Sequence, residues 1–357
     1  MSHALVTGFP GFIGRRLVRR LLDRDPDARV TALVEPRMAD AARALAADAG
    51  ERLEIVTGDI ARRRLDLGDD DWNRLTGSVT HVFHLAAIYD LAVPEELAQR
   101  VNVDGTGNVL ELCAACERFE RQAYISTAYV AGLRTGVVYE HELVMGQSFK
   151  NHYEKTKFQA EVWVRDEMHR IPTTILRPAI VVGDSTTGET EKFDGPYYIL
   201  RAISQAARLG QPAVQMGASD APFNVVPVDY VVAAIVAAAF DPATEGATLH
   251  LVDPEPLTAR ELVSTLSREY AGREPRGRIA PKLVEVALRV GKVQEAMGGT
   301  PRESIVYLNH RVRFDTRQAV DLLAPHGLTP PRFEEYAANM VRFFRGHEDD
   351  PAFSPKR

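Results

Sequence analysis

A glycine-rich turn close to the N-terminus places the strongest constraint on the fold. It separates a short β-branched run, residues 4–7, from an amphipathic stretch, residues 12–22, in a G-x-x-G-x-x-G spacing. A strand, a tight turn and a helix N-terminus together form a cradle for a diphosphate, because backbone N–H groups and the helix dipole point at the anion. We therefore predict dinucleotide binding by the whole turn: Gly8, Phe9, Pro10, Gly11, Phe12, Ile13 and Gly14.

The first half of the chain alternates short β-branched runs with longer amphipathic ones, which is typical of βαβ units on a parallel sheet. Further strands are expected at residues 29–34, 53–57, 81–85, 123–126 and 173–176. Helices are expected at residues 37–47, 70–75, 95–117 and 153–169. The sequence thus predicts an α/β fold with a doubly wound parallel sheet of Rossmann type.

Beyond residue 183 the sequence indicates a second, smaller region. Residues 183–195 are rich in Gly, Asp, Thr and Glu, whereas 224–229 and 248–252 have the composition of strands that return to the sheet. We expect residues 1–183 and about 224–255 to form the dinucleotide-binding Rossmann domain. A mostly helical C-terminal substrate lobe would comprise about 184–223 and 256–345, followed by a frayed polar tail at 346–357.

Composition excludes several classes of protein. The chain has 43 Lys and Arg against 49 Asp and Glu, a net charge of −6, which disfavours nucleic-acid binding. No membrane span is expected, because the longest apolar run, residues 231–240, is about half of the roughly 20 residues that a spanning helix needs. The N-terminus also lacks the pattern of a signal peptide, so the expected location is the cytoplasm.

The two cysteines, Cys113 and Cys116, lie inside the helical stretch 95–117. A redox-active C-x-x-C pair has its first cysteine at a helix N-terminus, where the dipole lowers the thiol pKa. Core packing is therefore the favoured role, in line with a reducing compartment. No histidine at matching spacing completes a metal site, so no metal is expected.

Two side chains near the end of the second strand bear on the choice of nicotinamide cofactor. Glu35 can accept hydrogen bonds from both hydroxyls of the adenosine ribose, which favours NAD(H). Arg37, with Arg15 and Arg16 nearby, provides the opposite signal, because a guanidinium can pair with the 2′-phosphate of NADP(H). NAD(H) is favoured, and NADP(H) stays open.

Residues after the third and fourth strands complete the expected cofactor site. Asp59 and Ile60 follow the third strand, where the Asp59 carboxylate can accept a hydrogen bond from the adenine amino group. The fourth strand leads into residues that let the backbone come close to the cofactor: Leu85, Ala86 and Ala87. His84, directly before them, is expected to be a packed residue rather than a catalyst.

A tyrosine and a lysine four residues apart are the candidate catalytic groups. Tyr153 and Lys157 share one face of a helix, and a nearby cation stabilises phenolate. The phenol then becomes a proton donor or acceptor nearer to neutral pH. Ser126 and Thr127 end the fifth strand, and the Thr127 hydroxyl is expected to hold the substrate oxygen.

Taken in order, these motifs resemble those of the extended short-chain dehydrogenase/reductase superfamily over nearly the whole chain. Within it the sequence is most similar to the thioester reductases and fatty acyl-CoA reductases of the male sterility branch. The resemblance rests on Thr7-Gly-Phe-Pro-Gly-Phe-Ile-Gly14, Asn102-Val-Asp-Gly-Thr-Gly-Asn-Val-Leu110, Ile125-Ser-Thr-Ala-Tyr-Val-Ala-Gly132, Tyr153-x-x-x-Lys-x-x-Ala-Glu161 and Leu176-Arg-Pro-Ala-Ile-Val-Val-Gly183.

The resemblance implies an NAD(P)-dependent oxidoreductase that moves hydride between nicotinamide and a carbonyl, aldehyde or acyl-thioester carbon of an apolar small molecule. It gives Thr127 the substrate-oxygen role and Tyr153 the acid/base role, with Ser126 behind them. Lys157 would bind the nicotinamide ribose and lower the phenol pKa. Along the nicotinamide edge it places Pro178, Ile180 and Val181. A homodimer is left open.

Two departures from that branch bear on cofactor and substrate. Glu35 stands where NADP-using relatives commonly carry an arginine. The chain has no adenylation or carrier module, so the acyl group is expected on coenzyme A or on a separate carrier. Nucleotide-sugar epimerases or dehydratases and 3β-hydroxysteroid dehydrogenases share several blocks and stay open as alternatives. The intact Tyr153 and Lys157 pair disfavours a cofactor-sensing module without catalysis.

Aromatic residues are the candidates for a substrate site between the carboxyl edge of the sheet and the lobe. They are Tyr89, Phe149, Tyr197, Tyr198 and Phe223, and for each of them core packing is the favoured alternative. An apolar stripe from Leu283 to Met297 at helical spacing fits core packing, with an acyl channel as the alternative. The lobe lacks a basic cluster for a nucleotide diphosphate, which disfavours a sugar-nucleotide substrate.

Overall fold

Seven parallel strands form the large central sheet. The computed structural model describes residues 2–89, 93–216, 220–279 and 306–353. The strand order is β11-β7-β5-β4-β1-β2-β3. The strands are β1 His3–Thr7, β2 Arg29–Val34, β3 Leu53–Thr57, β4 His81–His84, β5 Arg121–Ile125, β7 Thr173–Pro178 and β11 Thr248–Leu251. The order reverses where β4 lies beside β1, which confirms the predicted doubly wound fold.

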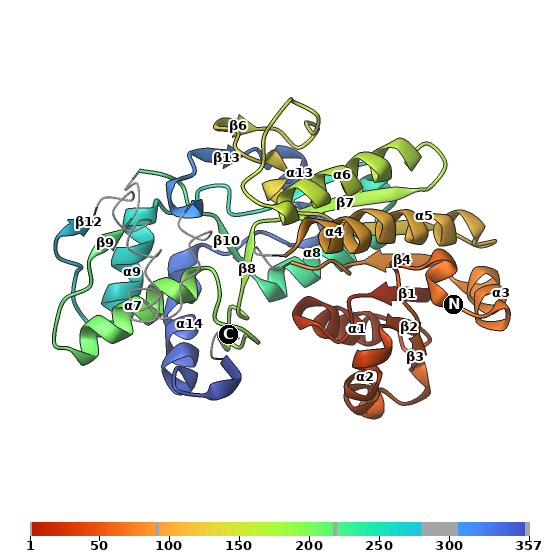
Figure 1. The fold of residues 1–357 in the computed structure, drawn as a ribbon, viewed down its shortest axis with the longest axis horizontal. Coiled ribbons are helices and arrows are strands. Elements are labelled where there is room, and N and C mark those ends of the chain that lie inside the picture. Colours follow the sequence, from red (N-terminus) through yellow and green to blue (C-terminus); the bar gives the residue numbers. More distant parts are fainter. Residues whose placement is uncertain (1, 90–92, 217–219, 280–305, 354–357) are drawn as a thin grey trace.

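Helices cover both faces of this sheet (Figure 1). One face shares a core cluster with α1 Phe12–Arg24, α2 Ala39–Ala46 and α8 Val228–Phe240. The other face shares a second cluster with α3 Asp69–Ser78, α5 Gly105–Ala115 and α6 His152–Glu167. Every residue of β4, β5 and β7 is buried as a result. Burial on both faces explains why these strands lack the alternation of a half-exposed strand.

The stretch 95–117, expected as one helix, divides into three parts. These are α4 Glu95–Ala98, a π-helical segment Gln99–Asp104, and α5. A Cβ on Gly105 would lie 3.0 Å from the Ile60 side chain, and one on Gly107 would lie 2.7 Å from the Trp163 ring. Close packing on two sides therefore explains glycines that helix propensity alone disfavours.

The cysteine pair packs in the core, as predicted. Cys113 and Cys116 are free and belong to the cluster under α5. Burial raises the pKa of both thiols, and that of Cys116 reaches about 12. Both sulfurs therefore stay protonated at neutral pH.

One segment that was expected to return to the large sheet does not join it. β10 Val225–Pro227 pairs with β8 Ile180–Val182 in a separate two-stranded sheet, whereas β11 joins the edge of the large sheet beside β7 as expected. The expectation for residues 224–229 was wrong because β7 ends at Pro178, which has no N–H to donate to the ladder. The chain then diverges as β8, and β10 follows β8 away from the sheet.

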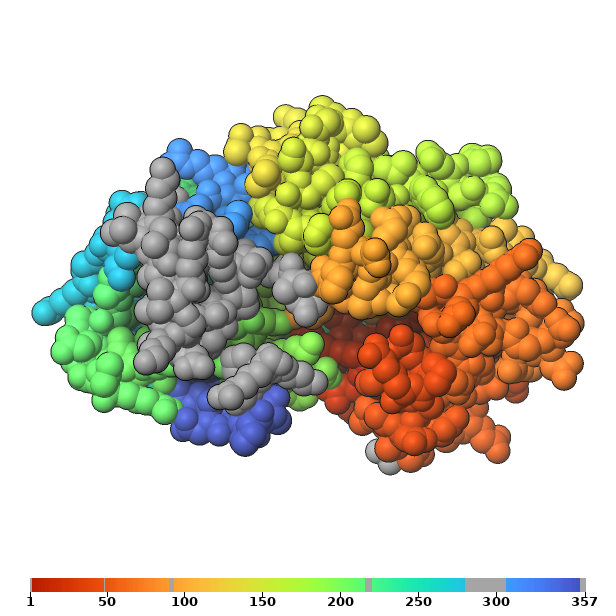
Figure 2. Space-filling view, in the orientation of Figure 1, coloured from red at the N-terminus to blue at the C-terminus, as the bar shows by residue number. Residues whose placement is uncertain are grey.

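The C-terminal lobe consists mostly of helices. Its main helices, α7 Pro196–Arg208, α9 Ala259–Ala271 and α14 Phe333–His347, pack together, and α13 Arg317–Leu323 packs on β11. Two short parallel pairs lie outside the large sheet. β9 Gln215–Met216 pairs with β12 Arg278–Ile279, and β6 Gly136–Val138 of the N-terminal half pairs with β13 Val312–Phe314. Figure 2 shows the lobe in green to blue beside the red and orange N-terminal half.

The end of the described chain differs from the frayed tail that its polar composition predicts. Its first residues form the last turn of α14, and Phe353 stacks on Phe193 with ring centroids 4.5 Å apart. The apolar stripe from Leu283 to Met297 lies outside the described residues. In the part of the chain that the structure describes, no helix is both long enough and apolar enough to span a membrane.

Candidate active site

The glycine turn forms a cradle lined by backbone. Gly8 has φ +94°, and a Cβ added to it would lie 3.0 Å from the Leu85 side chain. A Cβ on Gly14 would lie 2.5 Å from the Gly8 carbonyl oxygen. No side chain caps α1 at Gly11, and its first turn holds no acidic residue. The first-turn amides are thus left for an anion, so the turn fits the diphosphate of a dinucleotide.

Glu35 and Arg37, the two side chains that favour different cofactors, form an ion pair with each other. Arg37 Nε lies 2.6 Å from Glu35 Oε2, and both side chains are largely exposed. Arg15 and Arg16 point elsewhere, because they pair with Glu191 and Glu189 of the loop between β8 and α7. Only Glu35 and Arg37 of these four candidate side chains therefore stand together at the end of β2.

Asp59 is held by an unusual turn that the sequence does not reveal. Its N–H donates to the Leu65 carbonyl at 2.9 Å, and its Oδ1 accepts from Ala61 N at the same distance. Arg64, Leu65 and Asp66 all have positive φ, from 52° to 59°. Consecutive non-glycine residues in this region are strained. The strain is retained because Leu65 is fully buried, and Ile60 packs against Gly105.

Buried hydroxyl and imidazole groups fix the loop that contains Leu85, Ala86 and Ala87. Thr7 Oγ1 accepts from Ala86 N at 3.1 Å and lies 2.8 Å from His84 Nδ1. His84 Nε2 lies 3.0 Å from Thr106 Oγ1. Burial, with a smaller effect of the Lys157 charge, lowers the His84 pKa to about 3. His84 is therefore a neutral, packed residue that shapes the loop, as expected.

The structure brings Tyr153 and Thr127 together. Tyr153 lies in the first turn of α6, half-buried, and its hydroxyl is hydrogen-bonded to the Thr127 side chain. Burial raises the Tyr153 pKa to about 12, although the bond to Thr127 acts in the opposite direction. Thr127 follows β5 and its Oγ1 accepts from Tyr129 N at 3.3 Å. The phenol is therefore held in its protonated, donating form.

Lys157 lies one turn further along α6 but faces the strand. Its Nζ donates to the Ile125 carbonyl at 2.8 Å and to the Tyr124 hydroxyl at 3.1 Å. Burial lowers the Lys157 pKa to about 7, while Glu161 acts to raise it. The expectation that Lys157 lowers the Tyr153 pKa is thus not met: burial of the phenol dominates, and the ammonium points toward Ile125.

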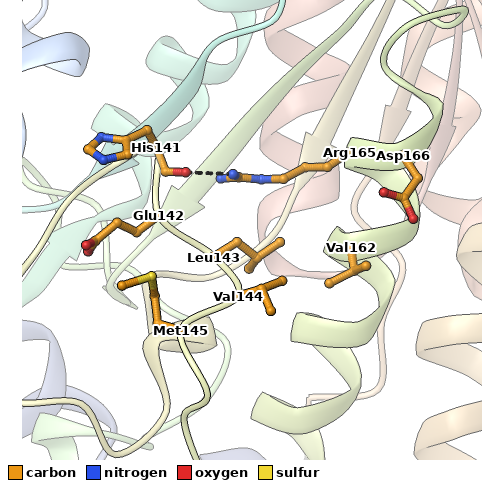
Figure 3. A pocket seen from close by; sticks show the side chains of 8 residues that line it. All are labelled: His141, Glu142, Leu143, Val144, Met145, Val162, Arg165 and Asp166. Atoms are coloured by element: carbon orange, nitrogen blue, oxygen red, sulfur yellow. Dashed lines mark hydrogen bonds between the residues drawn. The ribbon is translucent and has the colours of Figure 1, made fainter.

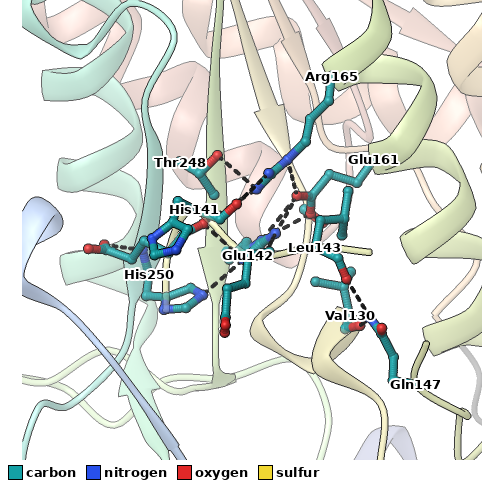
Figure 4. A network of polar contacts seen from close by, with 12 residues as sticks. Val130, His141, Glu142, Leu143, Gln147, Glu161, Arg165, Thr248 and His250 are labelled. Carbon is teal, nitrogen blue, oxygen red and sulfur yellow. Dashed lines mark hydrogen bonds and ion pairs between the residues drawn. The ribbon is translucent and has the colours of Figure 1, made fainter. Parts of the chain in front are cut away.

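Ser126 faces a buried ionic network instead of Tyr153. Its Oγ donates to Glu161 at 2.6 Å, and Glu161 also binds Arg177 at 2.6 Å and Arg165 at 3.2 Å. Figure 4 shows Glu161 and Arg165 of this network. Burial acts to raise the Glu161 pKa, but the charges of Arg177 and Arg165 and the hydrogen bonds from Arg177 and Ser126 together outweigh it, and the pKa is lowered. Ser126 therefore supports the end of β5 from behind. Glu161 and Arg177 stood in the recognised motifs, but nothing local revealed that they meet.

A second buried carboxylate lies directly after Tyr153. Glu154 Oε1 accepts from Tyr307 Oη at 2.7 Å and lies 3.2 Å from Lys150 Nζ. Asn151 caps α6 and donates to the Tyr307 hydroxyl at 3.0 Å. Burial raises the Glu154 pKa, and the nearby Lys150 charge offsets this only in part. Tyr307 thus ties the C-terminal part of the chain to α6, the helix that carries Tyr153, a contact that no local pattern indicates.

The π-helical segment supplies another residue that sequence reasoning missed. Asn102 is buried, accepts from Ile88 N at 2.9 Å, and donates to the Ile88 carbonyl at 3.2 Å. Its amide also donates to Thr156 Oγ1 at 3.0 Å. Asn102 therefore fixes the residue before Tyr89 to the helix that carries Tyr153. π-Helical segments often mark functional sites. Asn102 begins one of the blocks on which the family resemblance rests, but the resemblance gave it no role.

Of the predicted substrate aromatics, Tyr89 lies beside Tyr153. The Tyr89 ring is 49% exposed and lies edge-on to the Tyr153 ring, with centroids 6.3 Å apart. Phe149 packs on Phe158 at 5.0 Å. Tyr197 and Phe223 belong to the core instead, because they are only 1% and 4% exposed. Pro178 is buried at the end of β7, while Ile180 and Val181 are half-buried in β8.

A hollow of about 440 Å³ lies away from these groups (Figure 3). It is lined by the loop residues His141, Glu142, Leu143, Val144 and Met145, together with Val162, Arg165 and Asp166 of α6. None of the candidate catalytic or cofactor-binding residues lines it, so we do not assign it to the active site. Among the residues that the structure describes, no group of three metal-binding side chains comes together.

The parallel sheet, the glycine cradle and the sequence family together identify an NAD(P)-dependent oxidoreductase of the extended short-chain dehydrogenase/reductase type. The sequence profile of the family described as Male sterility protein matches residues 6–235. The chain belongs to this family.

Two relatives with known names are reductases much longer than this chain. The large subunit of L-2-aminoadipate reductase from Penicillium chrysogenum is 27% identical over 70% of this chain and 19% of its own length. Glycine betaine reductase from Emericella nidulans is 28% identical over 76% of this chain and 22% of its own length. The matched part of this chain therefore corresponds to about a fifth of each relative.

Solved structures agree in fold. The terminal R domain from the myxalamid PKS-NRPS pathway has a TM-score of 0.81 and 25% identity, covering 99% of this chain and 92% of that one. A thiolation-reductase di-domain from an archaeal non-ribosomal peptide synthetase has a TM-score of 0.74 and 19% identity, covering 97% of this chain and 76% of that one. UDP-glucuronic acid 4-epimerase from Bacillus cereus, at 19% identity and a TM-score of 0.66, covers 96% and 99%, so the fold alone does not select a reaction.

Proposed function

We propose that this chain reduces an apolar acyl thioester to an aldehyde with a nicotinamide cofactor. The observation that carries the proposal is the hydrogen-bonded Tyr153 and Thr127 pair, which lies at the same carboxyl edge of the parallel sheet as the glycine cradle. Doubly wound folds bind their ligands at this edge. The kinship with reductases and with the myxalamid R domain supports a thioester over a free ketone.

In this reaction the chain's own side chains act on the carbonyl oxygen. The reduced nicotinamide, when bound, supplies the hydride to the carbonyl carbon. Thr127 and Tyr153 donate hydrogen bonds to the oxygen as it gains negative charge, and Tyr153 supplies its proton. The carbonyl then re-forms as the C–S bond breaks, the thiolate leaves and takes up a proton, and Tyr153 recovers its own. The products are an aldehyde and a thiol.

The cofactor would lie along the carboxyl edge of the sheet. The glycine cradle holds the diphosphate, and Asp59, Ile60 and the loop of Leu85, Ala86 and Ala87 border the adenosine and nicotinamide halves. Lys157, with its pKa near 7, would turn its ammonium to the nicotinamide ribose. Pro178, Ile180 and Val181 would flank the nicotinamide.

A reductase assay tests the proposal. Acyl-coenzyme A thioesters, aldehydes, ketones and nucleotide sugars are offered with NADH or NADPH, and both the aldehyde and the thiol product are quantified. Thioesters with longer acyl chains should give higher kcat/KM, because each buried CH₂ contributes about 0.8 kcal/mol. Epimerisation of a nucleotide sugar without net cofactor oxidation would overturn the proposal.

NAD(H) is the proposed cofactor, because the Glu35 carboxylate repels a 2′-phosphate and already occupies Arg37. Glu35→Ala should narrow the preference for NADH over NADPH by about tenfold, since it removes the repulsion and frees Arg37. The ratio of the two kcat/KM values is the measurement. A wild-type preference for NADPH would contradict this choice.

A further inference from the structure

The loop between β8 and α7 is fixed on both sides of one lysine. On its N-terminal side, Glu189 lies 3.0 Å from Arg16 Nη2 and Glu191 pairs with Arg15, so the loop is tied to α1. On its C-terminal side, Phe193 is buried and stacks on Tyr197 with centroids 5.1 Å apart. Lys192 therefore extends from a backbone whose neighbours are anchored.

The ammonium of Lys192 reaches the aromatic group beside the catalytic phenol. Its Nζ lies 5.4 Å from the centroid of the Tyr89 ring, and that ring lies edge-on to Tyr153. Tyr89 is itself placed by Asn102, which binds both backbone groups of Ile88. The loop after β8 and the segment after β4 thus bring one cation and one exposed aromatic ring together beside Tyr153.

Lys192 keeps its charge available for a ligand. It is exposed, and it forms no ion pair with any carboxylate among the described residues. Lys155, two residues after Tyr153, differs from Lys192 because its ammonium forms an ion pair with Glu95 at 2.6 Å. An ammonium over a ring still has N–H donors to offer, and a phosphate oxygen is a strong acceptor for them.

We infer that Lys192 and Tyr89 form a subsite for a phosphate group on the tether that carries the acyl thioester. The inference rests on the proposed function. With the reacting carbonyl held at Tyr153 and Thr127, the part of the substrate that extends toward solvent passes the exposed side chains of Lys192 and Tyr89. In a thioester that part is the thiol-side tether, whereas the acyl chain extends inward.

The experiment compares one acyl group on three tethers: pantetheine, 4′-phosphopantetheine and coenzyme A. The wild-type chain should show about fivefold higher kcat/KM for 4′-phosphopantetheine than for pantetheine, and the ratio should fall as salt screens the charge. Lys192→Gln should bring the ratio close to one. Lys155→Gln, which removes an ion-paired lysine on the same edge, is the matched control and should retain the wild-type ratio.

The outcomes separate the two hypotheses. Equal kcat/KM for the first two tethers in the wild-type chain, or a ratio that survives Lys192→Gln, overturns the subsite and leaves thioester reduction standing. Failure to reduce any of the three thioesters overturns both. If Lys192→Gln abolishes the preference for 4′-phosphopantetheine over pantetheine, kcat/KM is compared for 4′-phosphopantetheine and coenzyme A. Equal values indicate that the subsite binds the single phosphate that is also present on a carrier protein's arm. A further gain on coenzyme A identifies the free nucleotide thioester.

Discussion

Two fully buried carboxylates on α6 have opposite electrostatic states. Burial raises the pKa of Glu154, which faces one ammonium, from Lys150, and the neutral phenol of Tyr307. Burial acts on Glu161 in the same way, but the guanidiniums of Arg177 and Arg165 outweigh it and its pKa is lowered. Two forked cations compensate the desolvation of a carboxylate, whereas one ammonium and a hydroxyl do not. Tyr153 directly precedes Glu154 on α6, and Lys157 lies between the two carboxylates along the helix.

The largest effect is expected at Tyr153, the proposed proton donor. Tyr153→Phe keeps the ring and removes the proton donor, so turnover should fall by about 10²–10⁴-fold. The free energy of unfolding should change by only about 1 kcal/mol, the value of the single hydrogen bond to Thr127. Steady-state kinetics and urea denaturation measure the two quantities. Tyr139→Phe, which changes an exposed tyrosine, is the control. Near-normal turnover in Tyr153→Phe would show that Tyr153 is not the proton donor.

Removing one cation from each cluster should destabilise the protein by different amounts. Arg177→Met leaves Glu161 buried and charged, which should cost about 3–5 kcal/mol of unfolding free energy. Lys150→Met should cost less, about 1–3 kcal/mol, because the raised pKa of Glu154 makes this carboxylate easier to neutralise than Glu161. The midpoints of urea denaturation give both values. Equal losses of unfolding free energy in the two variants would show that the two clusters do not differ in this way.

The pH dependence of stability should differ in sign for the two carboxylates. The raised pKa of Glu154 stabilises the fold below the unfolded value of about 4.3, and this contribution is lost as the pH rises through the folded pKa. Glu154→Gln should therefore gain stability relative to wild type as the pH rises. The lowered pKa of Glu161 contributes above about 4.3 and is lost as the pH falls, so Glu161→Gln should lose most at neutral pH. Unfolding free energies from pH 4 to 8 test this, and parallel curves would contradict it.

The smallest effect is expected at the contact from the C-terminal lobe. Tyr307→Phe removes the hydrogen bond to Glu154 and should cost about 1–2 kcal/mol of unfolding free energy. Tyr336→Phe, whose hydroxyl makes a long 3.4 Å bond to a backbone carbonyl, should cost less. Thermal unfolding of the two variants provides the comparison. A larger loss of stability in Tyr336→Phe than in Tyr307→Phe would contradict this prediction.

The sequence was sufficient for features that depend on neighbouring residues. Hydrophobic runs located the strands of the large sheet within a few residues, and the glycine spacing located the cradle, because both follow from local backbone geometry. The i, i+4 spacing of Tyr153 and Lys157 was also correct as geometry. It did not show where the ammonium points, since Lys157 is directed by Ile125 and Tyr124 of a distant strand.

Features that depend on distant contacts were not accessible in this way. Tyr307 meets Glu154 across 153 residues of chain, and Arg177 meets Glu161 only after β7 pairs with β5. The left-handed turn at Arg64, Leu65 and Asp66 has no glycine to signal it, because tertiary burial of Leu65 holds it in place. The burial of Tyr197 and Phe223 likewise follows from how the lobe packs. Aromatic composition alone leaves core and substrate roles equally open.

The state of the two cysteines makes the proposed reaction directly observable. A thioester reductase releases one thiol per turnover, and a chromogenic disulfide reagent responds to thiolate rather than to thiol. Cys113 and Cys116 are the chain's whole complement of sulfhydryl groups, and both are buried with raised pKa values. The native chain should therefore give almost no background colour. A continuous titration of released product, run beside the loss of NADH absorbance, would give the stoichiometry of thiol to hydride in a single cuvette.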